Sequence, residues 1–317
     1  MKKFLICTGE DNFFDKKGTM FKSNNKNLNI VFEKMYTSNS FFSKLKRNLG
    51  YPFIKSEVRE IWKSDLKDYD VIILFEIIVK NSIIKLIREK NPNIRIIIYF
   101  RNQFSNVKEK NLSLKYLKKY NCEFWTYNID DCKRYGFKYN CQFWNLNYLD
   151  LLDKNTKSEH GCLFLGRVKN RIDDIKTLHD ILKTNKIDDY FYLVPKTEYV
   201  FDKNYDNIYL DYLEYLKLLN KSKCVIDLVG EDNYGLTLRP LEAMFLGKKL
   251  ITNYKKIKSY DFYNPKNIFI LGYDREEELK SFVESPFEKI DTKISSEYNF
   301  DNWLNKFMKY DESEKVK

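Results

Sequence analysis

The sequence predicts an α/β protein made of two consecutive doubly wound domains, each built on a parallel β-sheet. Short apolar runs rich in β-branched residues alternate with amphipathic stretches, and this alternation restarts near residue 157. The chain has 317 residues, about twice the length of a typical domain of roughly 100–200 residues. We therefore expect two domains, with a ligand site in the cleft between them.

The first half contains a clear strand–helix–strand unit. Compact apolar runs at 71–75 and 94–100 predict buried strands, and the isoleucine spacing of 81–90 between them predicts a helix. The run 29–36 is either a strand or the start of a helix. Further strands are expected at 3–8, 123–127 and 140–144, and helices at 112–120 and 129–135.

The second half repeats the alternation with its own set of elements. Strands are expected at 161–165, 190–194, 223–228, 249–252 and 268–271, and helices at 173–185, 212–220, 238–246, 275–284 and 301–310. We place the first domain at residues 1–155 and the second at 156–300. Residues 301–317 are expected to form a helix that crosses back to the first domain, followed by a tail.

The composition argues against several classes of protein. The longest apolar candidate for a membrane span, 71–79, is short and contains Glu76. The apolar run 4–7, after two lysines, is shorter than the roughly seven residues that a secretory signal needs. Six scattered cysteines and two histidines show no metal-binding spacing. We expect reduced thiols, a cytoplasmic location and no zinc site.

Positive charge is concentrated in the first half of the chain. Residues 1–155 hold 29 Lys and Arg against 17 Asp and Glu, an excess of 12, whereas residues 156–317 hold 27 against 28. Such a basic domain attracts polyanions or an anionic membrane surface. Two alternatives stay open at this stage: a nucleic-acid-binding α/β protein that uses the basic first half, or a plain lysine-rich surface with no such partner.

The segment 224–252 carries the clearest chemical signal. It predicts a buried strand, a glycine-containing loop, a helix that opens at 235–237 and a second strand. A helix that starts at the carboxyl edge of a parallel sheet offers N–H groups and a partial positive charge to a phosphate. Arg239 and Glu242 lie three apart on one helix face. A cation for phosphate and a carboxylate for ribose hydroxyls would project together, unless the two form only a surface ion pair.

This segment resembles the donor site of GT-B glycosyltransferases, which use nucleotide sugars and consist of two Rossmann-like domains. The resemblance rests on Gly-Leu-Thr-Leu-Arg-Pro-Leu-Glu-Ala-Met-Phe-Leu-Gly at 235–247. The Lys-Lys-Leu-Ile-Thr-Asn run at 248–253 and the Asp-Asp-x-x-x-Tyr-Gly pattern at 130–136 are similar to bacterial capsule, O-antigen and lipooligosaccharide transferases. The likeness covers the second half well and the first half loosely.

The resemblance implies a donor site in the second domain. Glu242 would bind the ribose, and Arg239 would assist the N–H groups of 235–237 in holding the diphosphate. Such enzymes often place a basic pair after the first strand of this domain, which points to Arg167 and Lys169. The implied donor-binding residues are Gly166, Gly235, Leu236, Thr237, Arg239 and Glu242.

Fixed cations and helix dipoles can stabilise a leaving diphosphate without a metal, so no metal and no cofactor beyond the donor are expected. A base from the first domain would activate the acceptor hydroxyl, and the candidates are Glu10, Asp11 and Glu76.

Tyr234 stands where retaining members of the family often carry a second glutamate. The sequence therefore leaves open whether the anomeric configuration is inverted or retained.

The resemblance and the charge together imply the partners. The acceptor would be a lipid-linked oligosaccharide, lipooligosaccharide or polysaccharide at the inner face of the bacterial membrane. The enzyme would touch that membrane peripherally and would not bind nucleic acid.

Overall fold

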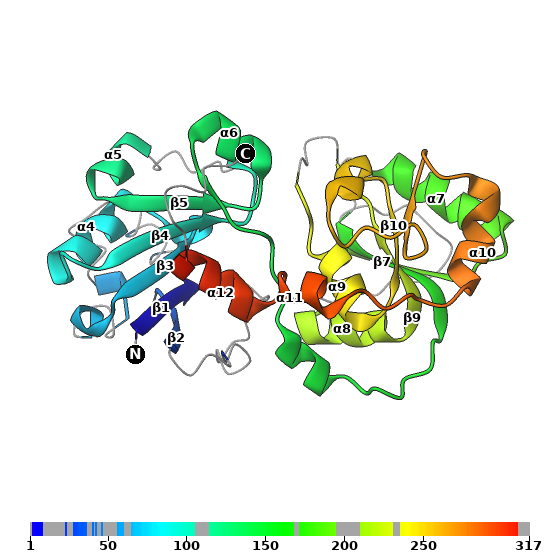
Figure 1. Ribbon diagram of the computed structural model, residues 1–317, viewed down its shortest axis with the longest axis horizontal. Coiled ribbons are helices and arrows are strands. Elements are labelled where there is room, and N and C mark those ends of the chain that lie inside the picture. Colours follow the sequence, from blue (N-terminus) through cyan, green and yellow to red (C-terminus); the bar gives the residue numbers. More distant parts are fainter. Residues whose placement is uncertain are drawn as a thin grey trace. The chain divides into compact units, whose positions relative to one another are not determined.

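The computed structural model describes residues 2–8, 23, 28–36, 40, 42, 46, 56–59, 65–104, 114–167, 171–194, 210–230 and 235–309. The chain forms two compact units. One contains Met1–Cys141 and Leu304–Lys317, and the other contains Gln142–Trp303. Each unit is built on its own parallel sheet, drawn in blue to green and in green to orange (Figure 1).

The first sheet has six strands in the order β2-β1-β3-β4-β5-β6, and every pairing is parallel. The runs Val71–Phe75 and Arg95–Phe100 are almost wholly buried because both faces of the sheet are covered. The strands are β1 (Lys2–Thr8), β2 (Leu28–Lys34), β3 (Val71–Phe75), β4 (Arg95–Phe100), β5 (Cys122–Thr126) and β6 (Lys138–Tyr139).

Helices from distant parts of the sequence cover this sheet. Helix α4 buries Ile83, Ile84 and Ile87 in the main core of the unit. On the other face, Phe307 of α12 makes edge contacts with Tyr99 and Trp125. The helical segments that contribute to this unit are η1 (Leu66–Asp68), η2 (Glu76–Ile78), α4 (Asn81–Lys90), α5 (Leu114–Lys119), α6 (Ile129–Tyr135) and α12 (Phe300–Lys309).

The second sheet has five parallel strands in the order β11-β10-β9-β7-β8. One face packs on α7 and α10, and α8 and α9 contact β9. The strands are β7 (His160–Arg167), β8 (Asp189–Val194), β9 (Ser222–Asp227), β10 (Lys249–Thr252) and β11 (Ile268–Ile270). The helical segments are η4 (Leu146–Leu151), α7 (Ile172–Thr184), α8 (Tyr212–Asn220), α9 (Arg239–Leu246), η5 (Lys255–Ser259), η6 (Glu276–Glu278), α10 (Leu279–Glu284) and α11 (Thr292–Ser296).

Each sheet contains a point where the strand order reverses. The chain passes from β7 to β8 on one side and then returns to place β9 on the other side of β7. In the first sheet, β2 and β3 flank β1 in the same way. Ligands of open α/β sheets bind beyond the carboxyl ends of the strands at such reversals. The two reversals are therefore the first places to look for a site.

The predicted α/β class with two Rossmann-like sheets is confirmed, and 29–36 is a strand rather than a helix. The strand predicted at 140–144 is wrong, because β6 ends at Tyr139 and Trp144 makes only an isolated bridge to Asn299. This run is apolar for another reason: Phe143 packs on Trp303, with ring centroids 4.2 Å apart. The helix predicted at 275–284 divides into η6 and α10.

Candidate functional site

A cluster of charged side chains lies at the strand reversal of the second sheet. Asp227 is the last residue of β9, and its carboxylate is 1% exposed. It accepts a hydrogen bond from Thr237 Oγ1 at 2.8 Å and pairs with Arg239 Nη1 at 3.5 Å. Arg239 also donates through Nη2 to the carbonyl oxygen of Leu165 in β7. One guanidinium therefore links the carboxyl ends of the two strands that flank the reversal.

A second guanidinium reaches the same edge of the sheet. Arg171 directly precedes α7 and donates to the carbonyl oxygen of Leu228, one residue beyond β9. Burial lowers the pKa of Arg171, and the positive charge of Arg239 lowers it further, while Asp227 opposes both effects. Two cations close enough to repel each other thus share Asp227, and an anionic ligand would relieve that repulsion.

The surroundings keep Arg239 in its charged form. Burial alone would lower its pKa, but Tyr215, Asp227 and Glu242 outweigh burial and raise it. The same burial raises the pKa of Asp227, against the pull of Arg239 and Thr237. Gly166 leaves room for this arrangement, since a Cβ atom there would lie 3.3 Å from Arg239 Nη2.

Glu242 lies one turn into α9 and is enclosed by tyrosines. Its Oε1 accepts from the Tyr212 hydroxyl at 2.7 Å, and its Oε2 accepts from the Tyr215 hydroxyl at 2.6 Å. The residue is 2% exposed, and burial raises the pKa of its carboxyl, although both hydroxyls and Arg239 act in the opposite direction. Trp144 Nε1 donates to the Tyr212 oxygen at 2.8 Å, which extends the network.

The helix that carries these residues begins slightly later than predicted. Helix α9 starts at Arg239, with Leu238 as its N-cap and Pro240 in the first turn, so 235–237 precede the helix and do not open it. The backbone of 235–237 still approaches the same edge, because Thr237 bonds to Asp227 at the end of β9.

The structure brings together Gly166, Thr237 and Arg239, and it places Glu242 within electrostatic reach of Arg239. Arg167 is the last residue of β7. Lys169, Glu10 and Asp11 lie outside the described residues.

Glu76 lies in the first unit, immediately after β3 at the carboxyl edge of that sheet. It is 1% exposed and accepts hydrogen bonds from the backbone N–H of Arg101 at 3.0 Å and from Asn102 Nδ2 at 2.5 Å. The carboxylate is therefore held by the residues that follow β4.

Sequence reasoning missed four residues of this cluster. The strand predicted at 223–228 places Asp227 in its interior, although an acidic residue near the end of a buried run signals a functional edge. Arg171 is a further basic residue after Gly166 and was passed over for Lys169. The other two are the tyrosines of α8, Tyr212 and Tyr215.

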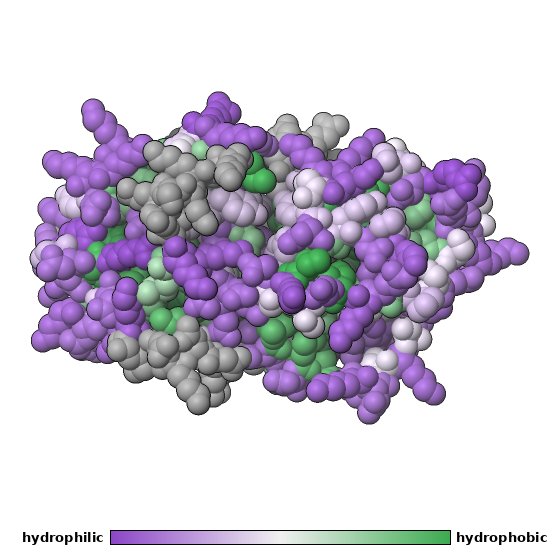
Figure 2. All heavy atoms as spheres, viewed as in Figure 1, coloured by the Kyte–Doolittle hydropathy of each residue, from purple (hydrophilic) through white to green (hydrophobic). Residues whose placement is uncertain are grey.

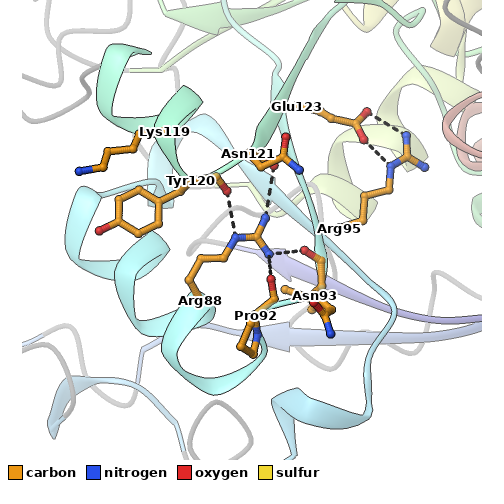
Figure 3. A pocket seen from close by; sticks show the side chains of 9 residues that line it. Arg88, Pro92, Asn93, Arg95, Lys119, Tyr120, Asn121 and Glu123 are labelled. Carbon is orange, nitrogen blue, oxygen red and sulfur yellow. Dashed lines mark hydrogen bonds and ion pairs between the residues drawn. The ribbon is translucent and has the colours of Figure 1, made fainter.

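A separate open pocket of about 500 Å³ lies in the first unit, at the amino ends of β4 and β5 (Figure 3). Arg88 there donates to backbone carbonyl oxygens of Tyr120, Pro92, Ile94 and Asn121. Its donors are thus committed to the protein, and the pocket lies opposite the strand ends where α/β sheets bind ligands. We assign it a structural role.

The surface of the described residues is mostly polar. Large apolar side chains that are exposed occur singly, and the visible face is predominantly hydrophilic (Figure 2). Within the described ranges, no helix has the length and apolar character required to cross a bilayer.

Comparisons with known proteins identify the fold. No family model and no curated protein matches the chain. Among solved structures, sucrose-phosphate synthase from Thermosynechococcus elongatus is similar, with a TM-score of 0.54 and 11% identity over 97% of this chain and 98% of that one. An alpha-glucosyltransferase in complex with UDP and a 13-mer DNA has a TM-score of 0.51 and 13% identity, over 90% of this chain and 89% of that one.

These likenesses extend over nearly the whole chain and show its fold. The protein has the GT-B architecture of two Rossmann-like domains, as the resemblance of 235–247 implied.

Proposed function

We propose that this protein is a glycosyltransferase that takes a sugar from a nucleotide-sugar donor. The observation that carries the proposal is the pair of guanidiniums, Arg171 and Arg239, at the strand reversal of the second sheet. Arg171 directly precedes α7 and Arg239 is the first residue of α9, and helix N-termini attract anions. The positive charges of two guanidiniums and two helix N-termini together balance the negative charge of a nucleoside diphosphate.

Within this proposal, each residue has a defined task. Arg239 and Arg171 bind the diphosphate, with help from the N–H groups of 235–237. Arg167 and Lys169 are further candidates for the same phosphates. Glu242 binds the ribose hydroxyls, because a carboxylate can accept about four hydrogen bonds and the tyrosines donate one to each oxygen.

The proposed reaction replaces one bond to the anomeric carbon with another. The acceptor oxygen bonds to that carbon as the carbon–oxygen bond to the diphosphate breaks, and the acceptor proton passes to a base. Fixed cations stabilise the negative charge on the leaving diphosphate, so the proposal includes no metal. Glu76, Glu10 and Asp11 are the candidate bases from the first domain.

The proposed acceptor is a lipid-linked oligosaccharide or a lipooligosaccharide of the bacterial surface, bound by the basic residues 1–155. The excess of 12 positive charges there supports contact with anionic lipid at the inner face of the membrane. The domain of residues 156–300 would then bind the donor.

DNA is a second candidate acceptor. The same positive charge suits a polyanion, and one solved structure of similar fold, an alpha-glucosyltransferase, holds both UDP and DNA. This alternative combines glycosyl transfer with the nucleic-acid-binding hypothesis that the composition raised.

One experiment tests the function and separates the acceptors. The protein is incubated at low salt with UDP-, GDP-, CMP- and dTDP-sugars and with anionic liposomes that carry lipid-linked oligosaccharide, or with duplex DNA. Nucleotide release that depends on one acceptor and is lost in Arg239→Ala supports the proposal and identifies that acceptor. Neither binding nor turnover of any nucleotide sugar would overturn it.

A further inference from the structure

Two tyrosines connect Glu242, the proposed ribose-binding residue, to a neighbouring helix of the second unit. Tyr212 and Tyr215 lie three apart on α8, so their side chains share one face of the helix. Figure 1 shows α8 beside α9, and the two hydroxyl bonds to Glu242 join these helices. Each carboxylate oxygen thus receives its own donor from the neighbouring helix.

The two hydroxyls determine how the carboxylate is oriented. A Glu side chain normally rotates freely about its last bond, but bonds of 2.7 Å and 2.6 Å on separate oxygens fix the plane of this one. Burial and the charge of Glu242 raise the pKa of both tyrosines, so both remain protonated donors at neutral pH. A carboxylate accepts about four hydrogen bonds, and among the described residues the tyrosine hydroxyls supply one to each oxygen, so the fixed group suits two adjacent ribose hydroxyls.

Tyr212 also links Glu242 to the segment where the chain enters the second unit. Trp144 donates its indole N–H to the Tyr212 oxygen at 2.8 Å and stacks on Phe245 of α9 at 5.3 Å. The backbone of Trp144 in turn bonds to Tyr298 and Phe300, close to where the chain leaves that unit. The orientation of Glu242 is thereby tied to a buried tryptophan.

We propose that Tyr212 and Tyr215 are positioning residues that hold Glu242 so that it selects a ribonucleotide donor over a 2′-deoxyribonucleotide donor. This inference rests on the proposed function and deepens it, since it names the class of donor. A 2′-deoxyribonucleotide lacks one of the two ribose hydroxyls. When it binds, the buried carboxylate of Glu242 loses a charge-assisted hydrogen bond that water does not replace.

The test measures UDP and 2′-deoxy-UDP binding by calorimetry, and GDP and 2′-deoxy-GDP if UDP does not bind. We expect the wild type to favour the ribonucleotide roughly tenfold or more. Tyr215→Phe and Tyr212→Phe should each bring this ratio closer to one, as should Glu242→Gln. Tyr298→Phe is the matched control, because it removes a tyrosine hydroxyl bond of 2.6 Å to a different carboxylate, Asp261, in the same unit.

A spectroscopic measurement separates positioning from general loss of structure. Nucleotide binding should change the tryptophan emission of the wild type, and Trp144→Phe should remove that change. Tyr212→Phe should reduce this change in emission, and Tyr298→Phe should leave it as in the wild type. An unchanged ribose preference in both α8 variants, with nucleotide still bound, would overturn this inference alone. If UDP, GDP, CMP and dTDP all fail to bind to the wild type, the proposed function and the inference are overturned together, whereas binding of dTDP alone overturns only the inference.

Discussion

Arg239 is the residue on which the candidate site depends most. Its guanidinium joins the end of β9, through Asp227, to the Leu165 carbonyl of β7, and its side chain is 22% exposed. The fold places this partly buried cation before any ligand arrives, so the proposed binding of phosphate would need little reorganisation. This pre-organisation explains why Gly166 stands beside it, where a larger residue would press on the guanidinium.

Replacement of Arg239 should affect diphosphate recognition specifically. We expect Arg239→Ala to weaken nucleoside diphosphate binding by about 10- to 100-fold, because a charge-assisted bond contributes about 1.5–3 kcal/mol. Arg239→Lys retains the positive charge opposite Asp227, so it should lose less affinity for the nucleoside diphosphate than Arg239→Ala. Arg275→Ala is the control, since that arginine is 78% exposed and pairs with Glu278, three residues along the chain. If Arg239→Ala and the wild type bind the nucleoside diphosphate with equal affinity, Arg239 does not contact the diphosphate.

The buried carboxyl of Glu242 should make stability depend on pH. Burial raises its pKa in the folded state, so its contribution to stability is fully present below the ordinary pKa of 4.5 and is lost as pH rises through the folded-state value. Glutamine cannot ionise. The free energy of unfolding of the wild type, relative to Glu242→Gln, should therefore fall as pH increases from about 4 to 8. Urea denaturation at several pH values measures this difference, and a difference that rises with pH would contradict the assigned direction.

At the scale of elements, the strand β7 depends on a glycine. A Cβ atom at Gly161 would lie 2.4 Å from the backbone oxygen of Asp188, which leads into β8. We expect Gly161→Ala to destabilise the second unit by about 1–3 kcal/mol through this overlap. Gly230→Ala is a suitable comparison, because a Cβ there meets no atom of the described residues within 4 Å. If the two variants have equal midpoints in urea unfolding, β7 and β8 can move apart at Gly161 without a loss of stability.

Arg95 adds polar contacts to the apolar packing of the last helix, α12, on the first sheet. Arg95 donates to the Phe307 carbonyl at 2.6 Å and forms two bonds to Glu123, as Figure 3 shows for the ion pair. Burial alone would raise the pKa of Glu123, but Arg95, Trp125 and Lys138 outweigh it and lower the pKa.

The stabilising contribution of Glu123 is therefore present above its ordinary pKa and is lost as pH falls through its lowered folded-state value. Arg95→Met should reduce the stability of the first unit by about 1–3 kcal/mol at pH 7. Hydrogen exchange along 304–309 should increase in this variant. Unchanged protection of that segment would show that apolar packing alone retains the helix.

Sequence patterns predicted regular elements well where packing is simple. The strand at 71–75 and the helices at 81–90 and 212–220 have the predicted bounds, because their apolar spacing is determined by burial against one sheet. The apolar run 140–144 was misassigned because its burial comes from Trp303 in a distant helix, which no local period reveals. Asp227 and Arg171 were missed for a related reason: their roles depend on β7 and β9 being neighbours.

At the scale of the whole molecule, the chain combines a recognisable architecture with a sequence that no family model matches. The fold class could be predicted from alternation, and 235–247 carried the resemblance to GT-B donor sites. The tyrosine network around Glu242 could not be predicted, because it requires α8 and α9 to lie together, and this follows from the strand order rather than from either helix.

We propose that the strand reversal of the second sheet binds a nucleoside diphosphate. Calorimetric titration of the purified protein with UDP-, GDP-, CMP- and dTDP-sugars, without added metal, measures this binding. We expect saturable binding of one ribonucleotide sugar, weakened in Glu242→Ala and in Arg239→Ala. Absence of binding to all four, together with salt-sensitive binding to DNA or RNA, would contradict it and favour a nucleic-acid-binding protein.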